Sequence, residues 1–116
     1  MTNYTASCHC GNIKIDFEME PGEQAISCNC SICRRKGSLL IFRTADKVVV
    51  HKDAVNTTSY QFGKKQLHHL FCKKCGLSPW IEGENNGLTT YAINLHCVDG
   101  LDEQSINIKK YDGAKL

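Results

Sequence analysis

The stretches Cys8-His9-Cys10-Gly11 and Phe71-Cys72-Lys73-Lys74-Cys75-Gly76 decide how this chain folds. Each places two cysteines one or two residues apart, so both sulfurs can turn toward one ion, and such a thiolate set favours zinc. The glycine that follows each pair allows a backbone turn that a side chain would oppose. Together the two motifs predict one closed, structural four-sulfur site, made of Cys8, Cys10, Cys72 and Cys75.

This four-sulfur site would join segments about 60 residues apart. Closing such a loop costs roughly 4 kcal/mol of chain entropy, whereas structural zinc binding contributes about 10–16 kcal/mol near neutral pH. The free energy of unfolding of a whole domain is only about 5–15 kcal/mol. Loss of this metal is therefore expected to unfold the chain.

The middle cysteine group, Cys28-Asn29-Cys30-Ser31-Ile32-Cys33, supplies three sulfurs and is one ligand short of a closed tetrahedron. A catalytic zinc ion has three protein ligands and one exchangeable position. Three thiolates donate heavily, which makes the ion a weak Lewis acid, so the group suits the activation of a sulfur nucleophile better than the splitting of water. The sequence predicts a second, catalytic zinc site at Cys28, Cys30 and Cys33.

Alternatives for this middle group remain open from the sequence. Cys97, or one of the histidines, would make the site structural if it supplied a fourth ligand; otherwise Cys97 is an ordinary buried thiol. The three cysteines would act as a redox-sensitive cluster if two of them joined when the metal is absent. Arg34 and Arg35, which follow directly, can hold the carboxylates of an anionic substrate or simply balance the local charge. The histidines considered are His9, His68, His69 and His96.

Length and composition predict a single zinc-binding domain spanning residues 1–116 with a modest core, since 41% of residues are hydrophobic. We expect no signal peptide and no membrane span, because the first residues have no basic start and no long apolar run follows. Eight cysteines in such a chain indicate a reducing, cytoplasmic compartment and metal rather than disulfides. Two zinc ions on seven thiolates would lower the net charge from +2 to about −1, which argues against a nucleic-acid partner.

The hydrophobic pattern predicts a mainly β fold with few or no long helices. Apolar and charged residues alternate over 13–20, the period of a half-buried strand. Other apolar or β-branched runs predict further strands at 39–42, 48–50, 57–62 and 89–95, with an edge strand at 106–108. Turns are expected at 21–22 and 83–87, and a loop or short helical turn at 34–38.

Taken together, the three cysteine motifs resemble those of the glutathione-dependent formaldehyde-activating family, which includes S-(hydroxymethyl)glutathione synthase and the centromere protein V domain. The matching segments are Cys8–Gly11, Cys28–Arg34 and Phe71–Gly76, and 93–99 looks like the closing strand of the family. The resemblance covers about residues 5–99.

This resemblance implies a twisted β-sheet fold of the Mss4-like kind, with zinc knuckles and two zinc ions per chain. It implies a structural site at Cys8, Cys10, Cys72 and Cys75 and an active zinc at Cys28, Cys30 and Cys33, where glutathione sulfur would bind. The expected activity is that of a carbon–sulfur lyase acting on an adduct of glutathione, or another small thiol, with formaldehyde as the family's carbonyl. The alternatives are a non-catalytic zinc-stapled binding module and a thiol redox sensor.

Overall fold

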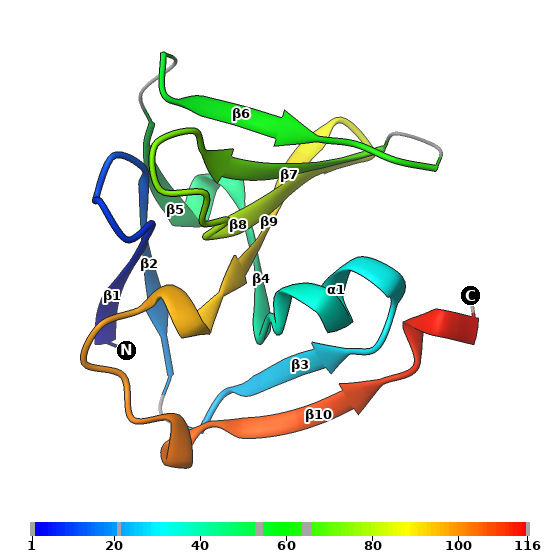
Figure 1. Ribbon diagram of the computed structural model, residues 1–116. Coiled ribbons are helices and arrows are strands. Elements are labelled where there is room, and N and C mark those ends of the chain that lie inside the picture. Colours follow the sequence, from blue (N-terminus) through cyan, green and yellow to red (C-terminus); the bar gives the residue numbers. More distant parts are fainter. Residues whose placement is uncertain (1, 21, 53–54, 64–65, 116) are drawn as a thin grey trace.

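The computed structural model describes residues 2–20, 22–52, 55–63 and 66–115, whose strands form two sheets (Figure 1). The smaller sheet has the order β1-β2-β5 and the larger one the order β10-β3-β4-β9-β8-β7-β6. The strands are β1 (Thr2–Ser7), β2 (Lys14–Met19), β3 (Gln24–Cys28), β4 (Leu40–Thr44), β5 (Val48–His51), β6 (Thr57–Tyr60), β7 (Leu67–Cys72), β8 (Trp80–Asn85), β9 (Leu88–Asn94) and β10 (Asn107–Tyr111). One six-residue α-helix, α1 (Ser31–Lys36), occurs in the described ranges. The mainly β fold without long helices is confirmed.

Strand β2 shows how the alternating pattern builds the smaller sheet. Ile15, Phe17 and Met19 are buried, while the residues between them face outward. This is the arrangement that the alternation over 13–20 predicts, because successive side chains of a strand point to opposite faces. The buried face of β2 packs into the main core.

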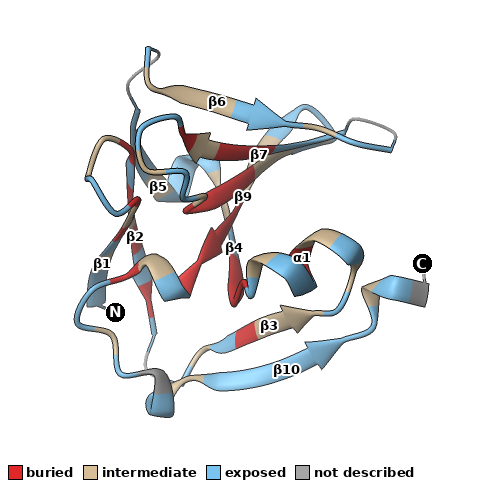
Figure 2. Cartoon of the chain, viewed as in Figure 1, coloured by how far each residue is buried: buried red, intermediate tan, exposed pale blue. Residues whose placement is uncertain are grey.

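The main core lies between the two sheets and is centred on Trp80. Trp80 is fully buried and faces Ile93 across the β8–β9 pair, and Ile93 faces Ile41 across the β9–β4 pair. Ile15 and Phe17 of the smaller sheet belong to the same buried cluster. Figure 2 shows this buried band running through the central strands. Burial of these side chains holds the two sheets against each other.

Strands β3 and β10 leave the rest of the larger sheet at a bend. The pairing of β3 with β4 consists of the single pair Ile26↔Leu40. Beyond it β3 pairs along its whole length with β10, in parallel, so that Tyr111 lies opposite Cys28. Strand β10 is exposed throughout and forms the edge of the sheet, as the run 106–108 predicts (Figure 2). This ribbon and α1 together carry the middle cysteine group.

Several local expectations change in detail. The predicted turn at 83–87 is too long, because β8 and β9 pair as far as Asn85↔Leu88 and only Asn86-Gly87 turns. Both turn residues have positive φ, 55° and 79°, which Asn and Gly tolerate best. The segment 34–38 is indeed partly helical, but α1 begins earlier, at Ser31. Of the expected turn 21–22, Pro21 lies outside the described residues.

The apolar run 39–42 is a strand only from Leu40 onward, and it is not buried throughout. Leu39, Leu40 and Ile41 are buried, but the Phe42 side chain is 49% exposed. Because Phe42 is apolar and exposed, it contributes to a surface rather than to the core. Within the described ranges, no helix has the length and apolar character needed to cross a membrane.

Candidate functional site

The two outer cysteine motifs meet as the sequence predicts. Cys8 and Cys10 lie in the loop after β1, while Cys72 ends β7 and Cys75 lies in the following turn. Their four sulfurs are all within 4.8 Å of one another, with 3.7 Å between those of Cys8 and Cys10 and 3.5 Å between those of Cys10 and Cys72. A tetrahedral zinc site with zinc–sulfur bonds of about 2.3 Å has sulfurs about 3.8 Å apart. The geometry therefore fits one tetrahedral metal ion held by four thiolates.

Backbone N–H groups around this four-sulfur group favour its thiolate form. The Lys74 N–H donates to Cys72 Sγ at 3.3 Å, and the Ile13 N–H donates to Cys8 Sγ at 3.5 Å. Hydrogen bonds from the backbone N–H groups of Cys10 and Leu77 lower the pKa of Cys75 to about 6. Donors that stabilise a thiolate lower the cost of its deprotonation on metal binding.

The position of this group indicates a structural role. Cys8 follows a strand of the smaller sheet, whereas Cys72 ends a strand of the larger one. Both side chains are buried, with exposures of 2% and 0%. An ion bound here would join the two sheets across their shared core.

The middle group also converges. Cys28 ends β3, Cys30 is the N-cap residue of α1 and Cys33 lies within that helix. Their three sulfurs are within 4.8 Å of one another, and the Cys30 N–H donates to Cys28 Sγ at 3.5 Å. Burial raises the pKa of Cys33 to about 12, so this thiol needs a bound cation to ionise. Three sulfurs with this spacing fit three corners of a tetrahedral thiolate site.

Cys97 lies elsewhere in the fold. It ends the short 3-10 helix Leu95–Cys97, and its Sγ accepts a long hydrogen bond of 3.7 Å from Asn94 Nδ2. Among the described residues, two groups of side chains alone could hold a metal ion: the quartet Cys8, Cys10, Cys72 and Cys75, and the trio Cys28, Cys30 and Cys33. Neither group includes Cys97 or a histidine. The structure therefore does not place Cys97 or a histidine beside the trio as a fourth ligand.

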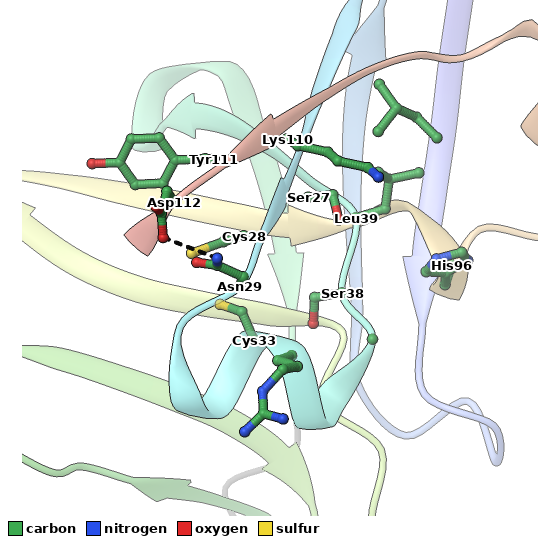
Figure 3. Close-up of a pocket in the computed structure, with 13 residues that line it drawn as sticks. Ser27, Cys28, Asn29, Cys33, Ser38, Leu39, His96, Lys110, Tyr111 and Asp112 are labelled. Carbon is green, nitrogen blue, oxygen red and sulfur yellow. Dashed lines mark hydrogen bonds between the residues drawn. The ribbon is translucent and has the colours of Figure 1, made fainter. Parts of the chain in front are cut away.

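Two cavities meet at the trio, and Cys28, Cys33 and Tyr111 line both of them. The first, which we call the cationic cavity, has a volume of about 600 Å³ and is lined by Arg34 and Lys110. Figure 3 shows Cys33 on α1 and Cys28 at the end of β3, beside the segment that carries Lys110, Tyr111 and Asp112.

The second cavity, which we call the apolar cavity, has a volume of about 520 Å³. Its wall includes Phe42 and the buried His69. His69 Nδ1 lies 3.4 Å from Lys36 Nζ, and burial together with this neighbouring charge lowers the pKa of His69 to about 4. The imidazole is therefore neutral near pH 7.

The structure separates the two predicted substrate-binding arginines. Arg34 lines the cationic cavity, whereas Arg35 donates from Nη1 to the Ser31 carbonyl at 2.8 Å and does not line either cavity. Sequence reasoning missed Lys110. The run 106–108 indicates a strand here, but its pattern does not show that the partner is β3, and so it does not place Lys110 beside the trio.

The C-terminal segment after β10 also reaches the trio. The Asn29 backbone N–H donates to the Tyr111 carbonyl at 3.2 Å, and its Nδ2 donates to Asp112 Oδ1 at 2.9 Å (Figure 3). Asn29 Oδ1 accepts from the Ala114 N–H at 3.0 Å. A Cβ added at Gly113 would lie 2.5 Å from Cys28 Sγ. Asn29, which lies between two cysteines of the trio, thus holds this segment directly against the trio.

We expect Gly113→Ala to weaken metal binding at the trio about tenfold, because the added methyl group would displace Cys28 Sγ. The quartet should retain its metal. Chelator competition that resolves the two metal equivalents measures both effects, and Ala114→Ser, a change at the exposed neighbouring residue, serves as the control. An unchanged affinity in a folded Gly113→Ala protein would show that the segment does not constrain the trio.

Comparison with known proteins agrees with this geometry. Residues 3–111 match the model of the family described as glutathione-dependent formaldehyde-activating enzyme. The chain belongs to this family. The match to the formaldehyde-activating family includes β10, and so it extends beyond the segment 5–99 that carries the resemblance in the sequence.

Among solved structures, the chain is similar to a Rhodobacter sphaeroides protein determined by a structural genomics consortium. The two are 29% identical, with a TM-score of 0.73, and the match covers 90% of this chain and 99% of the other. The fold of this chain, a member of the formaldehyde-activating family, is thus similar to nearly the whole of the Rhodobacter sphaeroides structure.

Proposed function

We propose that this protein binds two zinc ions, a structural one at Cys8, Cys10, Cys72 and Cys75 and a catalytic one at Cys28, Cys30 and Cys33. At the second site it acts as a carbon–sulfur lyase on the adduct of a small acidic thiol, such as glutathione, with a carbonyl compound. The observation that carries this proposal is that the trio lies where two cavities meet, within reach of a ligand. Family membership supports the same chemistry.

The proposed reaction is redox-neutral. In the direction of cleavage the carbon–sulfur bond breaks, the hydroxyl of the adduct becomes a carbonyl, and the hydroxyl proton leaves as the thiol is released. In the reverse direction the thiol adds to the carbonyl carbon and the oxygen gains the proton. A zinc ion bound at the trio would stabilise the thiolate form of the substrate sulfur.

The cationic cavity suits the acidic part of the thiol. Arg34 and Lys110 line it from α1 and from β10. A guanidinium and an ammonium can each bind a carboxylate through charge-assisted hydrogen bonds. The hydrogen bond between Asn29 and Asp112 links two residues of the same cavity wall, one of them between two cysteines of the trio. We assign Arg34 and Lys110 to binding of the substrate carboxylates.

None of the eight cysteines is joined to another in a disulfide, which supports the proposed cytoplasmic location. A membrane or a nucleic acid is not part of the proposal, because the sequence charge and pattern favour neither. A closed binding module and a redox sensor remain alternatives to the enzyme. The experiments below distinguish these two alternatives from the enzyme.

We expect Arg34→Ala to raise the dissociation constant for glutathione about five- to tenfold, since it removes one charge-assisted contact. Calorimetric titration of the zinc-loaded protein measures this. Arg35→Ala is the matched control, because the neighbouring arginine bonds to its own helix and should leave the affinity unchanged.

The same titration is paired with exchange NMR of a mixture of glutathione and formaldehyde, in which the protein should accelerate formation and breakdown of the adduct. Binding without acceleration would favour the binding module. Release of zinc with joining of two trio sulfurs under mild peroxide, and no acceleration, would favour the redox sensor. Equal effects of the two arginine substitutions would refute the assignment of Arg34.

A further inference from the structure

The apolar cavity on the other side of the trio has no task in the proposed chemistry of formaldehyde, whose carbon carries only hydrogen. It is nevertheless a sizeable hollow of about 520 Å³. Its wall is rich in aliphatic and phenylalanine side chains, among them Ile32, Leu40, Phe42, Phe62, Leu67 and Ile81.

Three of these side chains are exposed although they are large and apolar. Phe42, Phe62 and Leu67 are 49%, 43% and 50% exposed. They come from three separate segments and gather at one cavity. Clustered, exposed apolar side chains around a hollow are typical of a ligand site rather than of ordinary surface.

The charges of the two cavities differ. The cationic cavity is lined by Arg34, Lys110 and one carboxylate, Asp112, which accepts a hydrogen bond from Asn29. The described residues that line the apolar cavity include no lysine or arginine. The apolar cavity does include Glu84 and the buried His69, whose imidazole is neutral near pH 7. An anionic group would therefore favour the first cavity and an uncharged apolar group the second.

The direction of β3 places the cavities on different sides of the trio. Ser27 lines the cationic cavity and Ile26 lines the apolar one. Since neighbouring residues of a strand point to opposite faces, the two cavities lie on opposite faces of β3. Cys28, at the end of that strand, lines both. A ligand whose sulfur lies at the trio can extend into both.

We propose that the natural substrate is an adduct whose carbonyl-derived half carries a hydrophobic alkyl or aryl group, and that this group occupies the apolar cavity. The acidic thiol half occupies the cationic cavity, and the sulfur lies between them at the trio. This inference rests on the proposed function and extends it from formaldehyde to larger, hydrophobic carbonyl compounds. The chemistry is the same addition of a thiol to a carbonyl and its reversal.

S-methylglutathione and S-hexylglutathione are stable probes for this arrangement, because they share the acidic half and differ only in apolar length. Calorimetric titration of the zinc-loaded protein should show tighter binding of the hexyl compound, by about two- to fourfold for each added methylene that the cavity buries. Equal affinity for the two compounds would refute the inference.

Leu67→Ala should reduce the preference for hexyl over methyl at least threefold, since it removes a wall of the apolar cavity while leaving the cationic cavity intact. Leu88→Ala is the matched control, because Leu88 is also a leucine on a strand, is 47% exposed and lines neither cavity. Equal effects of both substitutions would overturn the placement of the hexyl group.

The two proposals fail in different ways. If glutathione binds and its formaldehyde adduct is turned over, but chain length has no effect, the proposed function stands and the hydrophobic substrate is wrong. If the hexyl preference is present but no thiol adduct is turned over, the cavity assignment stands and the lyase is wrong. If neither glutathione nor its two S-alkyl derivatives bind, both are wrong.

Discussion

Replacement of Cys72 by serine is expected to leave the purified chain largely unfolded at 25 °C. Cys72 is fully buried at the end of β7, and it belongs to the quartet, whose bound ion would join the two sheets. A serine hydroxyl is a poor zinc ligand, so most of the roughly 10–16 kcal/mol of structural zinc binding is lost. That loss is comparable with the whole free energy of unfolding of a typical domain, about 5–15 kcal/mol.

Far-ultraviolet circular dichroism and the dispersion of amide NMR signals measure this effect, together with the zinc content of the sample. Cys97→Ser is the matched control. Cys97 lies outside both sulfur groups, and its weak contact with Asn94 costs little to lose, so the control should remain folded with its zinc retained. A folded Cys72→Ser protein without metal in the quartet would show that the hydrophobic core suffices without this staple.

Replacement of Cys30 by serine is expected to abolish activity while the fold survives. The trio lies at the end of β3 and on α1, next to the exposed edge strand β10. It belongs to a smaller buried cluster than the main core, and the quartet remains complete. We expect the zinc content to fall from two ions per chain to one, and the acceleration of adduct exchange to fall at least about 100-fold, since ligand loss removes the ion that stabilises the thiolate.

Metal analysis, circular dichroism and exchange NMR on one sample make this test decisive. Cys97→Ser again controls for the loss of a sulfur that belongs to neither group. Full activity of a Cys30→Ser protein that holds one zinc would place the chemistry elsewhere. Unfolding of this protein would instead make the trio a second structural site.

The two cysteine groups could be predicted from the sequence because their ligands are close together within each motif. Two residues separate Cys72 from Cys75, and short gaps likewise separate Cys28, Cys30 and Cys33. Such short separations nearly fix how neighbouring sulfurs lie relative to one another. The alternation from Ile13 onward likewise specifies β2, because the period of a half-buried strand is local.

The cavities could not be predicted in the same way, because they depend on contacts between distant segments. The parallel pairing of β10 with β3 brings Lys110 and Gly113 to the trio from about 80 residues away. Register of this kind is set by the whole sheet, and an exposed edge strand has no hydrophobic pattern that specifies its partner. Phe42 of β4 and Leu67 of β7 likewise meet at the apolar cavity only through the order of strands in the larger sheet.

The central claim is that the trio holds a zinc ion with one position open to the sulfur of a small thiol. Zinc K-edge X-ray absorption of the two-zinc protein, recorded before and after addition of glutathione, tests it directly. We predict an average of about 3.5 sulfur donors per zinc without the thiol, because one site has four and the other three, rising to about 4 with it. An average of 4 before any thiol is added, or no change upon its addition, would contradict the claim.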